Sequence, residues 1–272
     1  MAELKLTIEE KLKNFPSVNY TSLYESVDRR KFMQDQFDQY GITKTSVYLT
    51  ERFNKISPMI NVTGSGRFMK DVVIQMGTII SHLNLLRNWY VSTDEEYAIF
   101  CEDDVSFESI DHWNFTWDDF VQHLPEDWNG VQLTKVQMPY CNPTGESNLA
   151  IKLTRGRWWG AYSLFRRSYV KLLLDRTCHG YNTYNLDLID IYGDQYGPII
   201  ENLLYLQTNG VYNFPMLVEN ANLSTTFENK VVITEGAELA NDSQYWSHRL
   251  VAEQWRLNGA TLNFKDAMTV LN

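Results

Sequence analysis

Three adjacent carboxylates, Glu102, Asp103 and Asp104, follow an apolar run that begins at Tyr97. Apolar and aromatic residues at this length predict a buried strand that ends at the acidic residues. Neighbouring carboxylates repel one another unless a positive charge lies among them, and oxygen ligands suit Mg²⁺ or Mn²⁺. Because strand side chains alternate, we expect Glu102 and Asp104 to point the same way. The pattern predicts a divalent metal site, and a solvated acidic turn that caps a helix is the alternative.

This strand lies within an alternation of strand-like and helix-like segments. Strands are expected at 15–23 and 46–49, and helices at 26–40, 71–90, 117–124, 166–176 and 197–207. Ser26 suits the N-cap of the first helix, and Gly41 suits its C-terminal stop. Gly77 and Ser81, four residues apart in the second helix, allow close packing against the sheet. The alternation predicts an α/β fold with an open, mostly parallel sheet and helices on both faces, whose ligands bind beyond the carboxyl ends of the strands.

The composition indicates one globular domain over residues 1–272, in which residues 1–14 form a short helix or an N-terminal arm. Hydrophobic residues make up 44% of the chain and charged residues 21%. The net charge of −10 makes non-specific nucleic-acid binding unfavourable, because phosphates attract Lys and Arg. Aromatic residues reach 14%, which suits stacking on sugars or bases and also an ordinary aromatic core.

Cysteine usage and hydropathy predict a compartment for the chain. Cys101, Cys141 and Cys178 are odd in number and lack metal-type spacing, so we expect free thiols in a reducing compartment. No apolar stretch approaches the roughly 18 residues of a membrane span, and the first residues lack a secretory apolar region. These features predict a cytoplasmic protein without a membrane span.

Two segments together resemble glycosyltransferase family 25, which includes lipopolysaccharide sugar transferases and collagen galactosyltransferases. The first runs from Gly77 through Ser81-His82-Leu83, and the second is Phe100-Cys101-Glu102-Asp103-Asp104-Val105. Thr78 stands where the family usually has Cys. Looser matches are Asp28-Arg29-Arg30, Trp159-Gly160-Ala161-Tyr162, Arg166-Arg167, and 198–204, where Glu201 replaces the usual Asp. The resemblance spans about residues 15 to 220.

The resemblance implies a GT-A fold and a nucleotide-sugar donor, expected to be a UDP-sugar. In that family the metal, expected here as Mn²⁺ or Mg²⁺, grips the donor diphosphate and stabilises it as a leaving group. Asp104 and Glu102 are then the metal ligands, and His248 is the candidate third ligand unless it is an ordinary surface histidine. The donor and cofactor site is expected to include Asp28, Arg29, His82 and Asp103. For His82 a core histidine is the alternative, and for Asp28 the alternative is a favourable interaction with the helix dipole.

An inverting transfer needs a base near the acceptor hydroxyl. Glu201, among apolar neighbours at a helix start, is the candidate base, because partial desolvation makes a carboxylate more basic. Asp194 is the second candidate. On the acceptor side, Trp158 and Trp159 suit stacking on a sugar face, and Gly160 and Tyr162 accompany them in the resembled segment.

The acceptor stays open between a glycan or lipopolysaccharide, a protein side chain and a hydroxymethylated DNA base, of which the negative charge disfavours the last. Two other functional classes also remain open for the protein. A metal-dependent phosphohydrolase or nucleotidyltransferase also places carboxylates at strand ends, although a two-metal site needs further carboxylates. An inactive carbohydrate-binding protein on the same fold is the third class. A compact chain of this kind suits a viral or bacterial source.

Overall fold

The computed structural model describes residues 6–53, 60–63, 73–134, 151–152, 162–180, 182–186, 200–205, 210–213 and 216–219. The helices are α1 (Ile8–Lys11), α2 (Val27–Tyr40), α3 (Val73–Ser92), α4 (Trp117–His123), α5 (Arg167–Thr177), α6 (Ile200–Tyr205) and the 3₁₀ helix η1 (Glu108–His112). The strands are β1 (Val18–Leu23), β2 (Thr45–Thr50), β3 (Asn61–Thr63), β4 (Tyr97–Glu102), β5 (Val105–Ser106), β6 (Gly130–Gln132), β7 (Ile151–Lys152), β8 (Ser163–Arg166), β9 (Cys178–Gly180), β10 (Thr183–Asn185), β11 (Val211–Asn213) and β12 (Val218–Glu219).

The central sheet has seven strands in the order β2-β1-β4-β8-β6-β11-β7. β1 is parallel to both β2 and β4, and β11 is parallel to β6. β8 is antiparallel to both of its neighbours, β4 and β6, and β7 is antiparallel to β11. Two small sheets, β3-β10-β9 and β12-β5, accompany it. The predicted α/β fold with a mostly parallel open sheet is confirmed.

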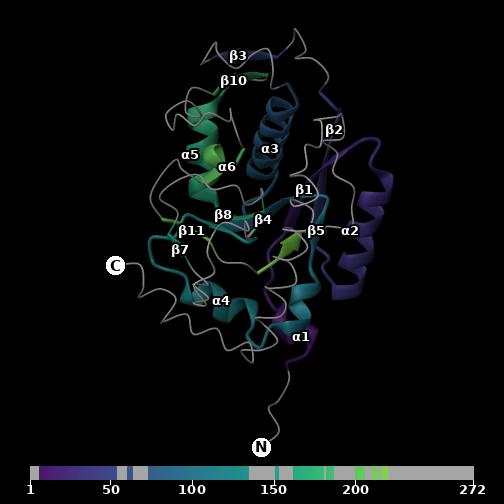
Figure 1. Cartoon of the computed structure of the whole chain (residues 1–272). Coiled ribbons are helices and arrows are strands. Elements are labelled where there is room, and N and C mark those ends of the chain that lie inside the picture. The colour runs from purple at the N-terminus through teal and green to yellow at the C-terminus, as the bar shows by residue number, and fades with distance from the viewer. Residues whose placement is uncertain are drawn as a thin grey trace, which may run out of the picture.

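Helices cover both faces of this sheet (Figure 1). The side chains of β4 alternate between two cores, as expected for a strand buried on both sides. Ile99 and Cys101 pack in one core with residues of α2, η1 and α4. Ala98 and Phe100 pack in the other core with residues of α3, α5 and α6. The acidic end of β4 is therefore held between two layers of buried side chains.

Helix α3 approaches the segment after β2 more closely than a larger residue at position 77 would allow. A Cβ atom added to Gly77 would lie 2.8 Å from the ring of Phe53. One turn later the Ser81 hydroxyl donates to the Gly77 carbonyl at 2.7 Å and lies 3.1 Å from the Thr50 hydroxyl. The predicted close packing at Gly77 and Ser81 is confirmed, and its partners are the end of β2 and Phe53.

Helix α2 begins and ends near its predicted limits. Gly41 adopts a left-handed conformation, with φ of 68°, and so ends the helix as predicted. Ser26 occupies the N-cap position as predicted, although its side chain makes no capping hydrogen bond. The helix is instead held by its buried residues Met33, Phe37 and Tyr40.

The N-terminal segment contains the short helix that the sequence allowed. Thr7 and Glu10 form a capping box at the start of α1. Lys11 is buried, and its ammonium donates to the carbonyls of Ile110 at 2.8 Å and Asp111 at 2.9 Å. Residues 6–14 therefore pack against η1 instead of forming a free arm.

Two further expectations concern thiols and membrane spans. Cys101, which is buried, and Cys178, which is partly buried, are free thiols, whereas Cys141 lies outside the described residues. None of the helices in the described ranges has the length and apolar character that crossing a membrane requires.

Candidate functional site

The path of the chain leaves a crevice above the carboxyl ends of β1 and β2. From β1 the chain passes through α2, on one face of the sheet, to β2. It then passes through α3, on the other face, to β4 on the far side of β1. The connections that leave β1 and β2 thus go to opposite faces. In open α/β sheets such a divergence is where ligands bind.

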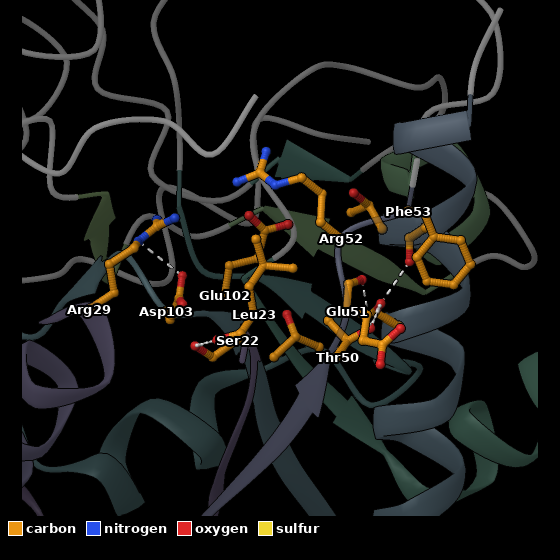
Figure 2. Close-up of a pocket in the computed structure, with 13 residues that line it drawn as sticks. Ser22, Leu23, Arg29, Thr50, Glu51, Arg52, Phe53, Glu102 and Asp103 are labelled. Carbon is orange, nitrogen blue, oxygen red and sulfur yellow. Dashed lines mark hydrogen bonds and ion pairs between the residues drawn. The ribbon is translucent and has the colours of Figure 1, made fainter. Parts of the chain in front are cut away.

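A pocket with an empty volume of about 610 Å³, part of it open to solvent, lies at this crevice. Its walls are Thr21, Ser22 and Leu23 of β1, Thr50 of β2 with 51–53 after it, Gly77, Thr78 and Ser81 of α3, Glu102 and Asp103 at the end of β4, and Arg29 of α2. The register explains the gathering, because Leu23 pairs with Thr50 and Thr21 pairs with Glu102. Figure 2 shows Arg29 and Phe53 at opposite sides of the pocket, with Glu102 and Asp103 between them.

The three predicted carboxylates turn toward different partners. β4 ends at Glu102, and Asp103 and Asp104 form a turn before β5, so the alternation expected for Glu102 and Asp104 stops at Glu102. Glu102 faces α3, where its Oε1 lies 3.2 Å from Nε2 of the buried His82. The Asp104 Oδ1 accepts a hydrogen bond of 2.5 Å from the hydroxyl of Tyr162.

Arg29 supplies a positive charge to this cluster. Its Nε lies 3.0 Å from the Asp103 Oδ1, and a terminal nitrogen of the same guanidinium pairs with Asp104 Oδ2 (Figure 2 draws the Asp103 pair). The Arg29 residue is only 9% exposed. Sequence reasoning identified Arg29 as a donor-site residue and missed its part as the counter-ion of the acidic turn. The available signal was the place of Arg29 in the first turn of the helix that follows β1.

Burial and mutual repulsion shift the pKa values of these groups. Burial, with the charge of Glu102, raises the pKa of Asp104 to about 6, although Arg29 and the Tyr162 hydroxyl oppose the shift. Burial raises the pKa of Asp103 against the effect of Arg29. Burial also acts to raise the pKa of Glu102, but the hydrogen bond and charge of His82 and the charge of Arg29 lower it below its ordinary value. Burial therefore disfavours the charged forms of Asp103 and Asp104, and the guanidinium of Arg29 favours them.

The donor chemistry fits a divalent cation that shares its coordination with a substrate. Among the residues that the structure describes, no group of three or more His, Cys, Asp or Glu side chains gathers as a metal site. Mg²⁺-type sites, however, use one or two carboxylates and complete their coordination with phosphates and water. Glu102 and Asp103 line the pocket, and Asp104 is adjacent, so oxygen ligands of the required kind are present.

Other predicted site residues have the following places. Asp28 is exposed in the first turn of α2. Tyr162 is buried, and its hydroxyl binds Asp104 instead of lining the pocket. Glu201 belongs to α6, but its side chain lies outside the described residues. The remaining predicted residues also lie outside them, namely Trp158, Trp159, Gly160, Asp194 and His248.

Sequence reasoning missed the hydroxyl groups of the pocket. Thr21, Ser22 and Thr50 stand at the ends of β1 and β2, and Ser81 faces Thr50 from α3. The available signal was their position at the carboxyl ends of two predicted parallel strands, where ligand contacts concentrate.

Comparisons with known proteins leave the family open. No protein-family model matches the chain, and no curated protein matches it. Among solved structures, the crystal structure of HddC from Yersinia pseudotuberculosis aligns over 78% of this chain and 77% of that chain, with 7% sequence identity and a TM-score of 0.33. A likeness this low carries no argument about fold or function. The resemblance to glycosyltransferase family 25 therefore stays a prediction.

Proposed function

We propose that the chain is a glycosyltransferase that moves a sugar from a nucleotide-sugar, expected to be a UDP-sugar, to an acceptor hydroxyl. The observation that carries the proposal is the pocket at the carboxyl ends of β1, β2 and β4, which joins an acidic strand end to a buried arginine. A diphosphate needs cationic partners, and a nucleoside needs hydroxyl and backbone groups. The pocket offers both kinds of group within one crevice.

The residues of the pocket divide into two chemical regions. The hydroxyls of Thr21, Ser22 and Thr50 lie at the ends of β1 and β2 and suit the ribose and base of a nucleoside. Glu102 and Asp103 with Arg29 form the charged region and suit the diphosphate with its counter-ion. This division supports a nucleoside diphosphate as the donor's leaving group.

Mn²⁺ or Mg²⁺, bound through Asp104 and Glu102, would supply positive charge that stabilises the departing diphosphate. The neighbouring side chains keep these carboxylates in place. Tyr162 holds one oxygen of Asp104, and His82 orients Glu102 from α3. Arg29, next to both Asp103 and Asp104, is positioned to neutralise phosphate charge as the sugar bond breaks.

The proposed base is Glu201, with Asp194 as the second candidate. The hydroxyl of Tyr205, one helical turn after Glu201, lies 2.7 Å from that of Ser163. Ser163 pairs with Phe100, two residues before the acidic end of β4. This contact anchors α6, the helix that contains Glu201, near the carboxyl end of the sheet. The arrangement supports removal of the acceptor proton by Glu201 as the hydroxyl attacks the anomeric carbon, with inversion and no covalent intermediate.

A metal-dependent phosphohydrolase is supported less well by the described strand ends. Two-metal sites need carboxylates from several strands. The last residues of β1 and β2 that line the pocket carry hydroxyls or an apolar chain, namely Ser22, Leu23 and Thr50. Glu51, directly after β2, adds one exposed carboxylate to the pocket wall, against three carboxylates at the end of β4 and in the turn after it. The carboxylate cluster is thus concentrated at the end of β4.

The proposal is tested by measuring thermal stability and binding with UDP, GDP and CMP, each with Mn²⁺ and with EDTA. We expect UDP to bind best and to bind more tightly with Mn²⁺. The matching nucleotide-sugars are then assayed for slow release of the free sugar by water. Stabilisation by no nucleotide, or release of inorganic phosphate or pyrophosphate in place of a nucleoside diphosphate, would reject the transferase.

A further inference from the structure

The carboxylates at the end of β4 and in the turn after it already have partners among the side chains of the protein, although these partners balance only part of the negative charge. Arg29 spans Asp103, at 3.0 Å from its Nε, and Asp104. The Tyr162 hydroxyl takes the other oxygen of Asp104 at 2.5 Å. The third carboxylate, Glu102, has His82 at 3.2 Å. Every carboxylate of the cluster therefore has a partner within the protein.

Arg29 is held firmly in this position by its helix. It is the third residue of α2, whose buried face packs through Met33, Phe37 and Tyr40 against the sheet. The neighbouring Arg30 ties the start of the helix to the end of β1, because it donates to the carbonyls of Leu23 and Tyr24. The Arg29 guanidinium thus reaches the turn from a rigid base, and its side chain is only 11% exposed.

A divalent cation and this guanidinium compete for the same oxygens. Two cations at one carboxylate repel each other strongly where water is largely excluded. A metal ion that binds Asp104 must therefore displace the guanidinium or share the carboxylate at a cost. A buried guanidinium that loses its carboxylate needs another anion, since an unpaired buried charge is unfavourable. The diphosphate of a nucleotide is an anion of suitable shape for a guanidinium.

We propose that Arg29 is a tethered counter-cation that holds the Asp103–Asp104 turn until a divalent cation and a diphosphate arrive together. The guanidinium then exchanges its carboxylate for the phosphate, which couples the binding of metal to the binding of nucleotide. This inference rests on the proposed function for the identity of the diphosphate ligand. Arg29 acts here as a ligand-binding residue that sets the order of assembly of the site.

Because the binding of metal and the binding of nucleotide are linked, the effect of each ligand on the affinity for the other can be measured. Metal alone must break the Arg29–Asp104 pair and leaves the buried guanidinium with Asp103 as its remaining carboxylate, so the affinity for metal alone is lowered. With metal and a diphosphate together, a phosphate takes the place of Asp104 beside the guanidinium of Arg29, so each ligand strengthens the binding of the other by the same factor. Without the guanidinium, metal alone should bind more tightly, and the mutual strengthening should shrink.

The test uses the full chain and measures Mn²⁺ binding by electron paramagnetic resonance, with and without UDP. In Arg29→Gln we expect Mn²⁺ alone to bind about tenfold more tightly or better than in the natural protein, and UDP to strengthen Mn²⁺ binding less. The matched control is Lys31→Gln, which removes a positive charge from the same helix. Lys31 is exposed and pairs with Asp35 at 2.6 Å, away from the acidic turn, so its loss should leave Mn²⁺ affinity unchanged.

A second variant keeps the test decisive where Arg29→Gln does not fold. Arg29→Lys keeps the charge but has a single nitrogen, which cannot span both carboxylates as the guanidinium does. We expect its Mn²⁺ affinity to exceed that of the natural protein by a smaller factor. If the folded variant binds Mn²⁺ no more tightly than the natural protein, the counter-cation role is overturned.

The outcomes separate this inference from the proposed function. Tighter Mn²⁺ binding by Arg29→Gln, in a protein that uses no nucleotide-sugar, would support the inference and reject the transferase. Mn²⁺-dependent sugar transfer, with Mn²⁺ affinity unchanged by Arg29→Gln, would support the transferase and reject the inference. Absence of Mn²⁺ binding to the natural protein and to both Arg29 variants would reject the counter-cation role and the metal site together.

Discussion

Two arginine pairs begin helices at opposite ends of the central sheet. Arg29 and Arg30 lie in the first turn of α2, beside the carboxyl end of β1. Arg166 and Arg167 stand where β8 passes into α5, and Arg166 pairs with Tyr97, the first residue of β4. The two pairs look alike in the sequence, but Arg29 pairs with largely buried carboxylates, whereas Arg166 and Arg167 lie over aromatic rings, with the exposed Asp94 4.0 Å from Arg167.

At the amino end of β4 the arginines rest on aromatic rings. The guanidinium of Arg166 lies 4.3 Å from the ring centroid of Trp128, and that of Arg167 lies 4.3 Å from that of Tyr90. Arg167 also donates to the Tyr90 carbonyl at 2.6 Å. Such contacts are favourable at the protein surface and need no ligand.

At the carboxyl end, Arg29 is paired with two carboxylates, Asp103 and Asp104. Grouping three carboxylates around one guanidinium in a half-buried pocket leaves excess negative charge, which is costly unless a further cation joins the site. An arginine that lies over aromatic rings thus contributes to the scaffold, whereas the arginine within the acidic cluster marks the end of the sheet where we propose that a ligand binds.

The largest expected effect at the carboxyl end is on the proposed base. Glu201→Gln should lower turnover by about 10² or more, the usual loss when a general base is removed, and should leave donor affinity nearly unchanged. Steady-state kinetics of transfer and equilibrium binding of UDP measure the two quantities. If Asp194→Asn shows this loss and Glu201→Gln does not, the base is Asp194.

Next in size is the effect of Asp104 on metal-dependent binding. Asp104→Ala should abolish the gain in UDP affinity that Mn²⁺ provides, because the turn loses the expected metal ligand. Calorimetric titration of UDP with Mn²⁺ and with EDTA measures the gain. The matched control is Asp35→Ala, an exposed carboxylate of α2 that pairs with Lys31. Equal UDP affinity with Mn²⁺ and with EDTA in the natural protein would contradict the metal site itself.

The sequence was sufficient to predict the scaffold and the place of the acidic cluster. Its strands and helices are set by local apolar patterns, and the carboxyl-end position of Glu102 follows from the strand that precedes it. The left-handed Gly41 was also predictable, since helix ends have local signatures. These features depend on residues close together in the chain.

The pairings within the site could not be predicted in the same way. Arg29 pairs with Asp104 although the two residues are 75 positions apart in the sequence, and Tyr162 donates to Asp104 from 58 positions away. Such contacts follow from strand order and helix placement, which local patterns leave undetermined. Three adjacent carboxylates indicate that a cation is needed, but the sequence alone does not distinguish a metal ion from an arginine.

A smaller effect is expected for the paired tryptophans, which lie outside the described residues. Trp158→Ala or Trp159→Ala should raise the acceptor Michaelis constant about tenfold, since loss of a stacking aromatic costs roughly 1–3 kcal/mol with a base and we assume a similar scale for a sugar. Hydrolysis of the donor by water is the control and should be unchanged. Normal acceptor kinetics in both variants would move the acceptor site elsewhere.

The smallest effect is expected at the amino end of β4, where a change to Arg166 tests whether the two arginine pairs have different roles. Arg166→Met keeps a long side chain and removes the cation that lies over Trp128. The free energy of unfolding should fall by about 1 kcal/mol, the scale of one cation–aromatic contact, and urea unfolding measures it. UDP affinity with Mn²⁺ should be unchanged, because Arg166 stands at the opposite end of β4 from Glu102. A clear loss of nucleotide affinity in a stably folded Arg166→Met would show that both ends of the sheet serve the site, and the distinction between the two pairs would fail.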